Sequence, residues 1–196
     1  MAAVVLAVPA CSSPEPAAEP EPSAPPATLA TTDGTEPGTE LGFGDSAVLA
    51  WQPTQDLAGE LELTVEAVAE QRQSVFDGWT RDDAMVASRP YFVTVTLANV
   101  GDTDLGGLDV PLYLLDTSDT LGPPWSFEEP FAPCRSRPLP AAFAPGDSTR
   151  TCLVYFARAG STYDAMAFQP VPDVEAITWT GEPERVDRER PSRRRR

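Results

Sequence analysis

The chain has 196 residues, enough for one ordinary domain with appendages, and it is strongly acidic, with 30 Asp and Glu residues against 14 Arg and a formal net charge of −16 at pH 7. It has no Lys and no His, which excludes Ser-His-Asp triads, Cys-His dyads, imidazole metal sites and Schiff-base lysines. Residues 41–181 alone carry 20 acidic residues and seven Arg, so we expect no nucleic-acid partner for them.

Residues 2–10 are all apolar or small, and Cys11 follows them directly, which indicates export. Because a bilayer span needs about 20 apolar residues, residues 1–10 are typical of a secretory signal peptide. The stretch LAVPA before Cys11 resembles the lipobox of bacterial lipoproteins, which are cut just before a Cys that then carries the lipid. We therefore predict lipidation at Cys11; the alternative is a frayed N-terminus in which Cys11 has no role. No Lys or Arg precedes the apolar run, which leaves open whether translation starts at Met1 or upstream.

Residues 11–40 are predicted to form a disordered linker. Between residues 12 and 40 the chain has seven Pro, six acidic residues, no basic residue and almost no large apolar side chain. Such a segment cannot bury enough apolar surface to offset its conformational entropy. Its proline content favours an extended spacer between a lipid and a folded domain, and the alternative is a plain tail without a spacing role.

Residues 41–181 have the alternation that is typical of β-strands. In the run GELELTVEA (59–67), apolar residues alternate with Glu and Thr, which predicts a half-buried strand with Ala67 on the apolar face. The acidic run 60–70 is also compatible with a helix, because Glu and Ala favour helices. The run RPYFVTVTLANVGD (89–102) is clearer, since β-branched residues dominate it and Gly-Asp closes it with turn chemistry.

Further short apolar runs follow, separated by Gly, Pro, Asp or Ser: VPLYLL, TRTCLVYFAR, DAMAFQP and VEAITWTG. Many short strands with turn signals between them, and no long stripe with a period of 3.6 residues, predict an all-β fold. We expect an immunoglobulin-like antiparallel β-sandwich over residues 41–181, with Trp179 in its core. About 140 residues are enough for a core of that kind.

Cys134 and Cys152 lie 18 positions apart, around a corner rich in proline. Cys152 belongs to the predicted strand TRTCLVYFA, and Cys134 to the proline-bounded loop before it. In an exported protein whose Cys11 carries a lipid, these two cysteines can pair only with each other, so we predict a disulfide between them. The alternative is two reduced cysteines in a cytoplasmic protein.

Segment 90–181 resembles a family of exported actinobacterial lipoproteins of unknown function that have an immunoglobulin-like β-sandwich domain. The resemblance is carried by YFVTVTLANVGDTDLGGLDVPLYLLD, PCRSRPLPAAFAPGDSTRTCLVYF and ITWTG. The group is similar to a secreted mycobacterial immunogenic β-sandwich. The resemblance implies the fold, an extracytoplasmic location and the pairing of Cys134 with Cys152, and it supplies no catalytic residue.

The loop GDTDLGGLD places Asp102, Asp104 and Asp109 near two glycines, which makes them weak candidates for Ca²⁺ ligands. Gly106 stands where an EF-hand loop has its third acidic residue, so a hairpin turn between strands is the stronger interpretation. We predict no other metal and no cofactor.

Large aromatic residues mark two loop-like segments. Phe76 and Trp79 flank Gly78, and Trp125 and Phe127 lie in PPWSFEEPF. Phe76, Trp79 and Trp125 are candidates for an exposed binding tip. The stronger interpretation is that such aromatic side chains pack over an end of the sandwich.

The sequence favours a protein that is not an enzyme. Two pairs of adjacent acidic residues, Asp82-Asp83 and Glu128-Glu129, are the main candidates for proton-transfer groups. In extended chain the two members of each pair point to opposite faces and cannot act on one bond. A hydrolase would need two acids from different strands within about 5–10 Å of each other in a cleft.

Residues 182–196 are expected to be a disordered, arginine-rich tail that adsorbs to anionic surfaces, folds back on the acidic body or does nothing. Together these features predict a non-enzymatic lipoprotein on the outer face of a cell membrane, with its lipid in that membrane and an envelope protein or polymer as its partner. The alternatives are a lipoprotein that binds a small ligand or Ca²⁺ and a hydrolase that works through a carboxylate pair.

Overall fold

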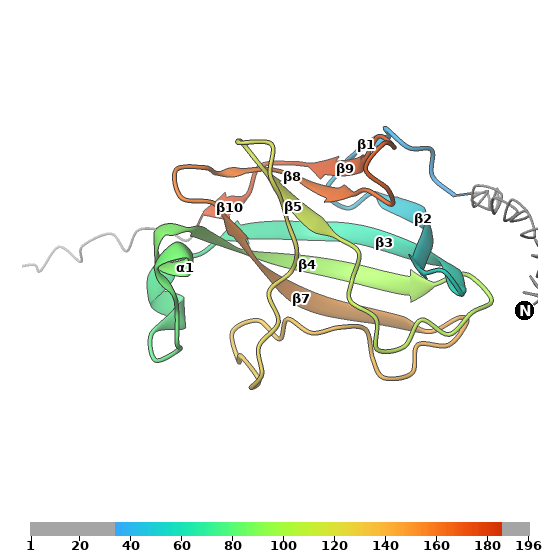
Figure 1. Ribbon diagram of the computed structural model, residues 1–196, viewed down its shortest axis with the longest axis horizontal. Helices are drawn as coiled ribbons and strands as arrows, with labels where there is room; N and C mark the ends of the chain where they lie inside the picture. Colours follow the sequence, from blue (N-terminus) through green and yellow to red (C-terminus); the bar gives the residue numbers. More distant parts are fainter. Residues whose placement is uncertain (1–33, 186–196) are drawn as a thin grey trace, which may run out of the picture. The chain divides into compact units, whose positions relative to one another are not determined.

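The computed structural model describes residues 34–185, which form two packed β-sheets (Figure 1). The first sheet is built on three long neighbouring strands: β3 (Leu57–Glu70), β4 (Arg89–Asn99) and β7 (Ser148–Ala157). The all-β, immunoglobulin-like sandwich expected from the sequence is therefore confirmed. The predicted signal peptide, Cys11, the linker as far as residue 33 and the run Arg193–Arg196 lie outside the described residues.

The two sheets are mainly antiparallel. The first has the order β10-β3-β4-β7, and β2 (Ser46–Thr54) also pairs with β3. The second has the order β1-β9-β8-β5-β6, with the bounds β1 Glu40–Gly42, β5 Tyr113–Asp116, β6 Leu121–Gly122, β8 Tyr163–Phe168 and β9 Ile177–Thr180. Two short pairings are parallel, β1 with β9 and β10 (Glu184–Arg185) with β3. Strand pairing thus continues past residue 181, the expected end of the domain.

The acidic run 60–70 is a strand and not a helix. In β3, Leu61, Leu63 and Val65 are completely buried, and the intervening Glu62 and Thr64 are only partly buried. Leu63 pairs with Leu97 and Val65 with Val95 of β4. The pairing register shifts between Val65 and Ala67, which is a β-bulge, so that Val68 instead of Ala67 takes the next buried position. Beyond the bulge, the side chain that points into the core is therefore shifted by one position along β3.

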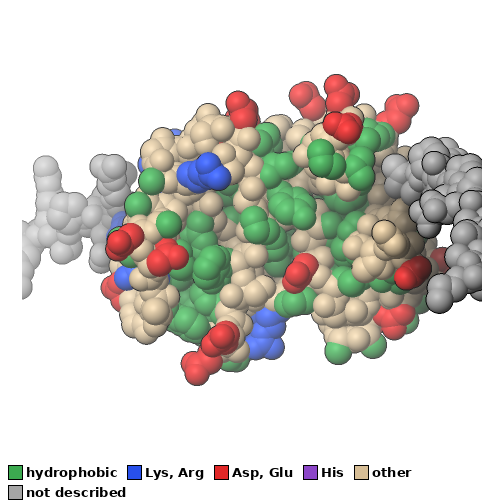
Figure 2. All heavy atoms as spheres, in the orientation of Figure 1, with side chains coloured by type: hydrophobic (Ala, Val, Ile, Leu, Met, Phe, Trp, Pro, Cys, Tyr) green, Lys and Arg blue, Asp and Glu red, His purple; other side chains and the backbone are tan. Residues whose placement is uncertain are grey.

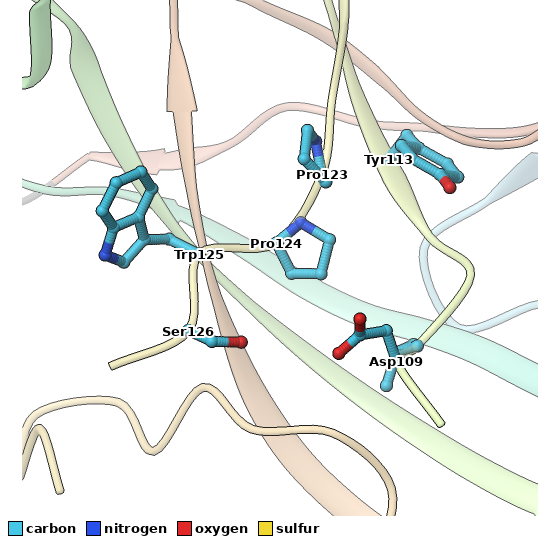
Figure 3. Close-up of a pocket in the computed structure, with 7 residues that line it drawn as sticks. Asp109, Tyr113, Pro123, Pro124, Trp125 and Ser126 are labelled. Carbon is cyan, nitrogen blue, oxygen red and sulfur yellow. The ribbon is translucent and has the colours of Figure 1, made fainter. Parts of the chain in front are cut away.

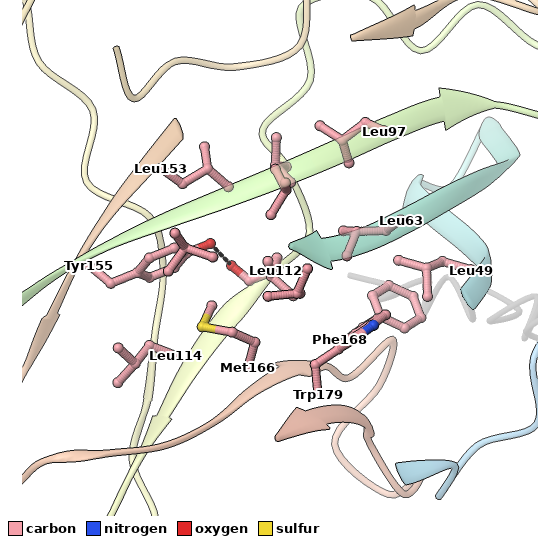
Figure 4. Close-up of a cluster of buried hydrophobic side chains, with 14 of the residues drawn as sticks. Leu49, Leu63, Leu97, Leu112, Leu114, Leu153, Tyr155, Met166, Phe168 and Trp179 are labelled. Carbon is pink, nitrogen blue, oxygen red and sulfur yellow. Dashed lines mark hydrogen bonds between the residues drawn. The ribbon is translucent and has the colours of Figure 1, made fainter. Parts of the chain in front are cut away.

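The main core lies between the sheets and includes Trp179, as expected (Figure 4). Its polar atoms have partners: the Tyr155 hydroxyl donates to the Leu112 carbonyl at 2.8 Å, and the Trp179 indole N–H donates to the Asp45 carbonyl at 3.0 Å. Burial raises the pKa of Tyr155 and of Tyr163, so both hydroxyls stay neutral and can donate. No buried side-chain N or O atom among residues 34–185 lacks a hydrogen bond.

Residues 100–112 do not form the hairpin turn that the sequence favours. They carry the chain from β4 in the first sheet to β5 in the second, because β4 pairs with β3 and β7 whereas β5 pairs with β6 and β8. Asn99 holds the start of this crossover, since its amide donates at 2.7 Å to the carbonyls of Thr103 and Phe143. A Cβ at Gly106 would lie 2.5 Å from the Ala141 carbonyl oxygen, so the crossover requires glycine there.

Among residues 34–185, helical structure is confined to the connection between β3 and β4. A 3₁₀ turn, η1 (Gln73–Phe76), is followed by the short helix α1 (Asp83–Ala87). Asp82 caps α1 by accepting a hydrogen bond from the Met85 N–H at 2.7 Å. Within residues 34–185, no helix has the length and apolarity that crossing a membrane requires.

Candidate functional site

A second hydrophobic cluster lies on the outer face of the first sheet, away from the main core. In β7, Leu153 and Tyr155 point into the main core, so Val154 and Phe156, which alternate with them, point outward. The connection between β3 and β4 and the loop after β6 both fold over this face. We call the result the outer aromatic cluster; it comprises Val75, Phe76, Trp79, Phe92, Phe127, Phe131, Cys134, Cys152, Val154 and Phe156.

Phe76 is the centre of the outer aromatic cluster. It is completely buried, and the centroid of its ring lies 5.1 Å from that of Phe131 and 5.3 Å from that of Phe156. Trp79 is partly buried and packs edge-on against Phe127 and Phe131. The structure therefore corrects the binding-tip interpretation for Phe76, which is internal, whereas Trp79 keeps part of its surface.

The disulfide between Cys134 and Cys152 fastens the cluster to the sheet. The two Cα atoms lie 5.3 Å apart, within the usual range for a disulfide, so this prediction is confirmed. Two residues further along, the Ser136 hydroxyl accepts a hydrogen bond from the Val154 N–H at 3.1 Å. The loop that precedes β7 is thereby joined to β7 at two adjacent points.

Trp125 is the exposed member of the three aromatic candidates. Its side chain is 42% exposed, although its ring packs edge-on against Phe156 with centroids 5.9 Å apart. Its backbone is fixed, because its N–H donates to the Val154 carbonyl at 2.7 Å and forms an isolated bridge with β7. We call residues 121–126 the Trp125 ridge. It carries two of the five exposed large hydrophobic side chains among residues 34–185, Leu121 and Trp125.

A groove of about 330 Å³ adjoins the Trp125 ridge, and Trp125 is one of its lining residues (Figure 3). Figure 3 shows Tyr113 and Asp109 on one side of the Pro123-Pro124 segment and the Trp125 ring on the other, turned away from them. Ser126 lines the same groove. The ridge therefore offers an exposed indole and, beside it, a groove in which Asp109, Tyr113 and Ser126 place polar groups among apolar side chains.

Asp116 holds the hairpin that leads into the Trp125 ridge. It is buried, and its carboxylate accepts hydrogen bonds from the Ser118 hydroxyl at 2.6 Å and from the N–H groups of Ser118, Thr120 and Arg158. Burial opposes ionisation of this carboxyl, but the hydrogen bonds outweigh it and hold the pKa of Asp116 below its usual value. Asp116 is not among the candidates predicted from the sequence, although the run DTSDT has the composition of an Asx turn.

The variant Asp116→Asn is expected to be less stable than the wild type by about 1–3 kcal/mol near neutral pH. The substitution replaces one carboxylate oxygen with an NH₂ group, which cannot accept hydrogen bonds from the surrounding N–H groups. A carboxyl whose pKa is lower in the folded state contributes stability above its unfolded pKa of about 3.9 and loses it as the pH falls through the folded pKa. The difference between the two proteins should therefore shrink below about pH 4. Thermal unfolding followed by circular dichroism between pH 3 and pH 7 measures it.

Asp164→Asn in β8 is the matched control for Asp116→Asn, because Asp164 is exposed. We expect it to unfold like the wild type across the same pH range. A stability gap for Asp116→Asn that stays constant down to pH 3 would contradict the electrostatic role assigned to Asp116.

The three aspartates of the crossover do not come together as a metal site. Asp104 accepts hydrogen bonds from the N–H groups of Phe143 and Gly106 at 3.0 and 2.8 Å, which hold its pKa below the usual value and pin the crossover to residue 143. Asp102 contacts the Thr103 hydroxyl, and Asp109 lines the groove beside the Trp125 ridge. Residues 34–185 contain no group of three or more Asp, Glu, Cys or His side chains that could hold a metal ion.

The adjacent acid pairs have places in the fold. Asp82 is the cap of α1, and Asp83 is its first residue. Glu128 and Glu129 are exposed in the loop between the Trp125 ridge and Phe131. In Figure 2, acidic side chains lie mostly around the margin of the visible face and hydrophobic side chains gather in its middle.

The fold and the fastened loop define the class: a disulfide-bonded β-sandwich domain with an exposed aromatic ridge. No protein-family model matches the chain, and no curated protein matches it. Among solved structures, MPT63, a secreted protein of Mycobacterium tuberculosis, is similar with a TM-score of 0.51 and 10% sequence identity. The match covers 72% of this chain and 96% of MPT63. At that identity the likeness shows the β-sandwich fold alone.

Proposed function

We propose that this chain is an exported, lipid-anchored and non-enzymatic binding module of the cell envelope, and that the Trp125 ridge is its recognition surface. The observation that carries the proposal is the exposure of Trp125 on a backbone fixed to β7. Tryptophan is enriched among the residues that dominate binding energy, and a rigid loop loses little conformational entropy on binding. The similarity to a secreted protein and the apolar stretch before Cys11 support the extracytoplasmic location.

The groove beside the ridge supports recognition of a polar partner in the envelope. Asp109 and Ser126 supply acceptors and a hydroxyl donor, and Tyr113 adds an aromatic ring with its own hydroxyl. A few polar groups around aromatic surface are the usual lining of a binding site. An envelope protein or polymer could therefore contact the indole of Trp125 and the groove beside it.

The substitution Trp125→Ala is expected to weaken binding of the full-length protein to a purified envelope fraction of the source organism by about 30-fold, the loss that removal of a dominant contact of about 2 kcal/mol produces. A cosedimentation titration with separated membrane and wall-polymer fractions measures this loss and shows which fraction carries the partner.

Val171→Ala is the matched control for Trp125→Ala, because Val171 is 41% exposed and lies in the connection between β8 and β9. It should bind the envelope fraction like the wild type. Wild-type protein that binds neither fraction, or a Trp125→Ala variant that binds as well as the wild type, would remove the Trp125 ridge from the proposal.

The lipid anchor has its own test. The intact mass of the native protein from the membrane fraction is expected to correspond to a chain that begins at Cys11 and carries a diacylglycerol-sized adduct, and reduction should add two hydrogen atoms for the disulfide. Cys11→Ser should stay unprocessed and leave the membrane fraction. A native chain that begins at Met1 with three free thiols would place the protein in the cytoplasm and end the export proposal.

A further inference from the structure

A second hollow, of about 240 Å³, adjoins the groove beside the Trp125 ridge and shares Val110 with it. Its base is apolar, because Leu97, Val110 and Leu139 are almost completely buried there. The threonines of β7 at positions 149 and 151 contribute hydroxyl groups along one side. This hollow is smaller than the pockets of about 300–1,000 Å³ that hold drug-sized ligands, so it suits a small molecule or the end of a larger one.

Two arginines line the other side of the hollow. In the segment CRSR, Cys134 and Ser136 are buried whereas Arg135 and Arg137 are exposed. The Ser136 N–H donates to the Cys134 carbonyl at 2.8 Å, which closes a tight turn centred on Arg135 and leaves both arginine side chains on the surface, on either side of the buried Ser136. Arg135 and Arg137 both line the hollow, so two positively charged side chains border a base that is apolar.

The backbone that carries these arginines is held in place on both sides. The disulfide fixes Cys134 to β7, and the Ser136 hydroxyl accepts from the Val154 N–H between the two arginines. Beyond Arg137, the Leu139 N–H donates to the Leu108 carbonyl at 2.8 Å. The backbone that carries the pair is thus set before any ligand binds, which reduces the part of the entropic cost of binding that comes from ordering a loop.

The arginine pair is also unusual for its charge. Three ion pairs occur among residues 34–185, and they involve Arg81, Arg89 and Arg150. Arg135 and Arg137 have no acidic partner within those residues, and no carboxylate lines the hollow. In a domain with a large excess of acidic residues, two positive charges side by side without a counter-charge create a local site of the opposite sign.

We infer that this hollow binds an organic carboxylate, with the anionic group between Arg135 and Arg137 and the apolar part on Leu97, Val110 and Leu139. Arginine binds carboxylates through two parallel hydrogen bonds, and the adjacent apolar base favours a ligand that also has a hydrophobic body. The threonine hydroxyls can complete the hydrogen bonding of the carboxylate. The site goes beyond the proposed function, because it does not use the indole of Trp125.

Phenylacetate is a suitable probe for this site, and phenylacetamide, which has the same shape without the charge, is its control. For the full-length protein we expect phenylacetate to bind with a Kd of about 1 mM or tighter, and phenylacetamide at least ten times more weakly. Titrations followed by ¹H–¹⁵N NMR give both constants. The amide signals that shift should belong to residues 135–137, 139 and 149–151.

The double variant Arg135→Gln/Arg137→Gln should lose at least tenfold in phenylacetate affinity and keep its thermal stability, because both side chains are exposed. Arg158→Gln removes the same kind of charge at the far end of β7 and should bind like the wild type. Trp125→Ala should also bind phenylacetate normally, so that this site and the envelope-binding proposal fail separately. Equal binding of the two probes, no binding of either, or normal binding by the double variant would overturn the inference.

The chain's own acidic segment is the competing source of carboxylates. A full-length variant with Glu15, Glu19 and Glu21 changed to Gln tests it. Unchanged phenylacetate affinity in this variant supports an external ligand. Phenylacetate binding that appears only in this variant would show that the linker itself fills the hollow, and would overturn the inference as stated.

Discussion

Replacing Phe76 with alanine is expected to lower the free energy of unfolding by about 3–5 kcal/mol, the usual cost of deleting a buried phenylalanine ring. The ring is completely buried and lies within 6.3 Å of four other rings, those of Phe92, Phe127, Phe131 and Phe156. Phe92 and Phe156 belong to the strands β4 and β7, and Phe127 and Phe131 belong to the loop that the disulfide joins to β7, so the rings cannot easily close over the cavity. Urea unfolding followed by circular dichroism gives the loss.

Val86→Ala is the matched control for Phe76→Ala, since Val86 lies in α1 of the same connection but is 52% exposed. It should change stability by less than about 0.5 kcal/mol. A loss below about 1 kcal/mol for Phe76→Ala would mean that the outer aromatic cluster collapses around the gap and contributes little to the stability of the domain.

Removal of the disulfide is expected to cost about 3 kcal/mol, because closing a loop of 18 positions restricts the unfolded chain by that amount in the chain-entropy model. Cys134→Ala/Cys152→Ala should therefore unfold at lower urea concentration than the oxidised wild type. The same variant is expected to weaken binding at the arginine-lined hollow, since Arg135 follows Cys134 directly.

Reductant provides the internal control for the disulfide prediction. Adding it to the wild type should shift the urea midpoint to that of the double variant, and adding it to the double variant should change nothing. If the oxidised and reduced wild type unfold at the same urea concentration, the disulfide does not stabilise the domain, and the rigidity ascribed to the loop before β7 would need another origin.

Two long strands of the first sheet could be predicted from the sequence because each has one buried face and one mainly polar face. This holds for the run that became β4 and for most of β3. The run that became β7 is apolar on both faces around Val154 and was recognised as a short apolar run between turn residues. The bulge after Val65 could not be predicted, since it depends on how β3 pairs with β4 and not on any local sequence signal. The parallel pairings of β1 and β10 involve two or three residues each, too few for a period to be recognised.

Packing was the stronger interpretation for Phe76, but its place on the outer face of the first sheet could not be predicted, for a different reason. A sheet in a sandwich is expected to have one face in the core and one in water, and the sequence gives no sign that two loops distant in the chain fold over the outer face together. The disulfide between Cys134 and Cys152, by contrast, followed from counting cysteines. The pair Arg135 and Arg137 could have been noticed from its alternation with Cys134 and Ser136, but its place at a hollow depends on the crossover that supplies Val110.

At the level where Phe92 of β4 pairs with Val154 of β7, the first sheet has packed side chains on both sides: the main core on one and the outer aromatic cluster on the other. The molecule is therefore three layers deep at this place. Amide hydrogens in the middle layer of such an arrangement exchange with solvent only when the whole domain opens, whereas those of the covering loops can exchange through local opening. The double covering thus divides the chain into a slowly exchanging centre and a cover that can loosen while the sandwich stays folded.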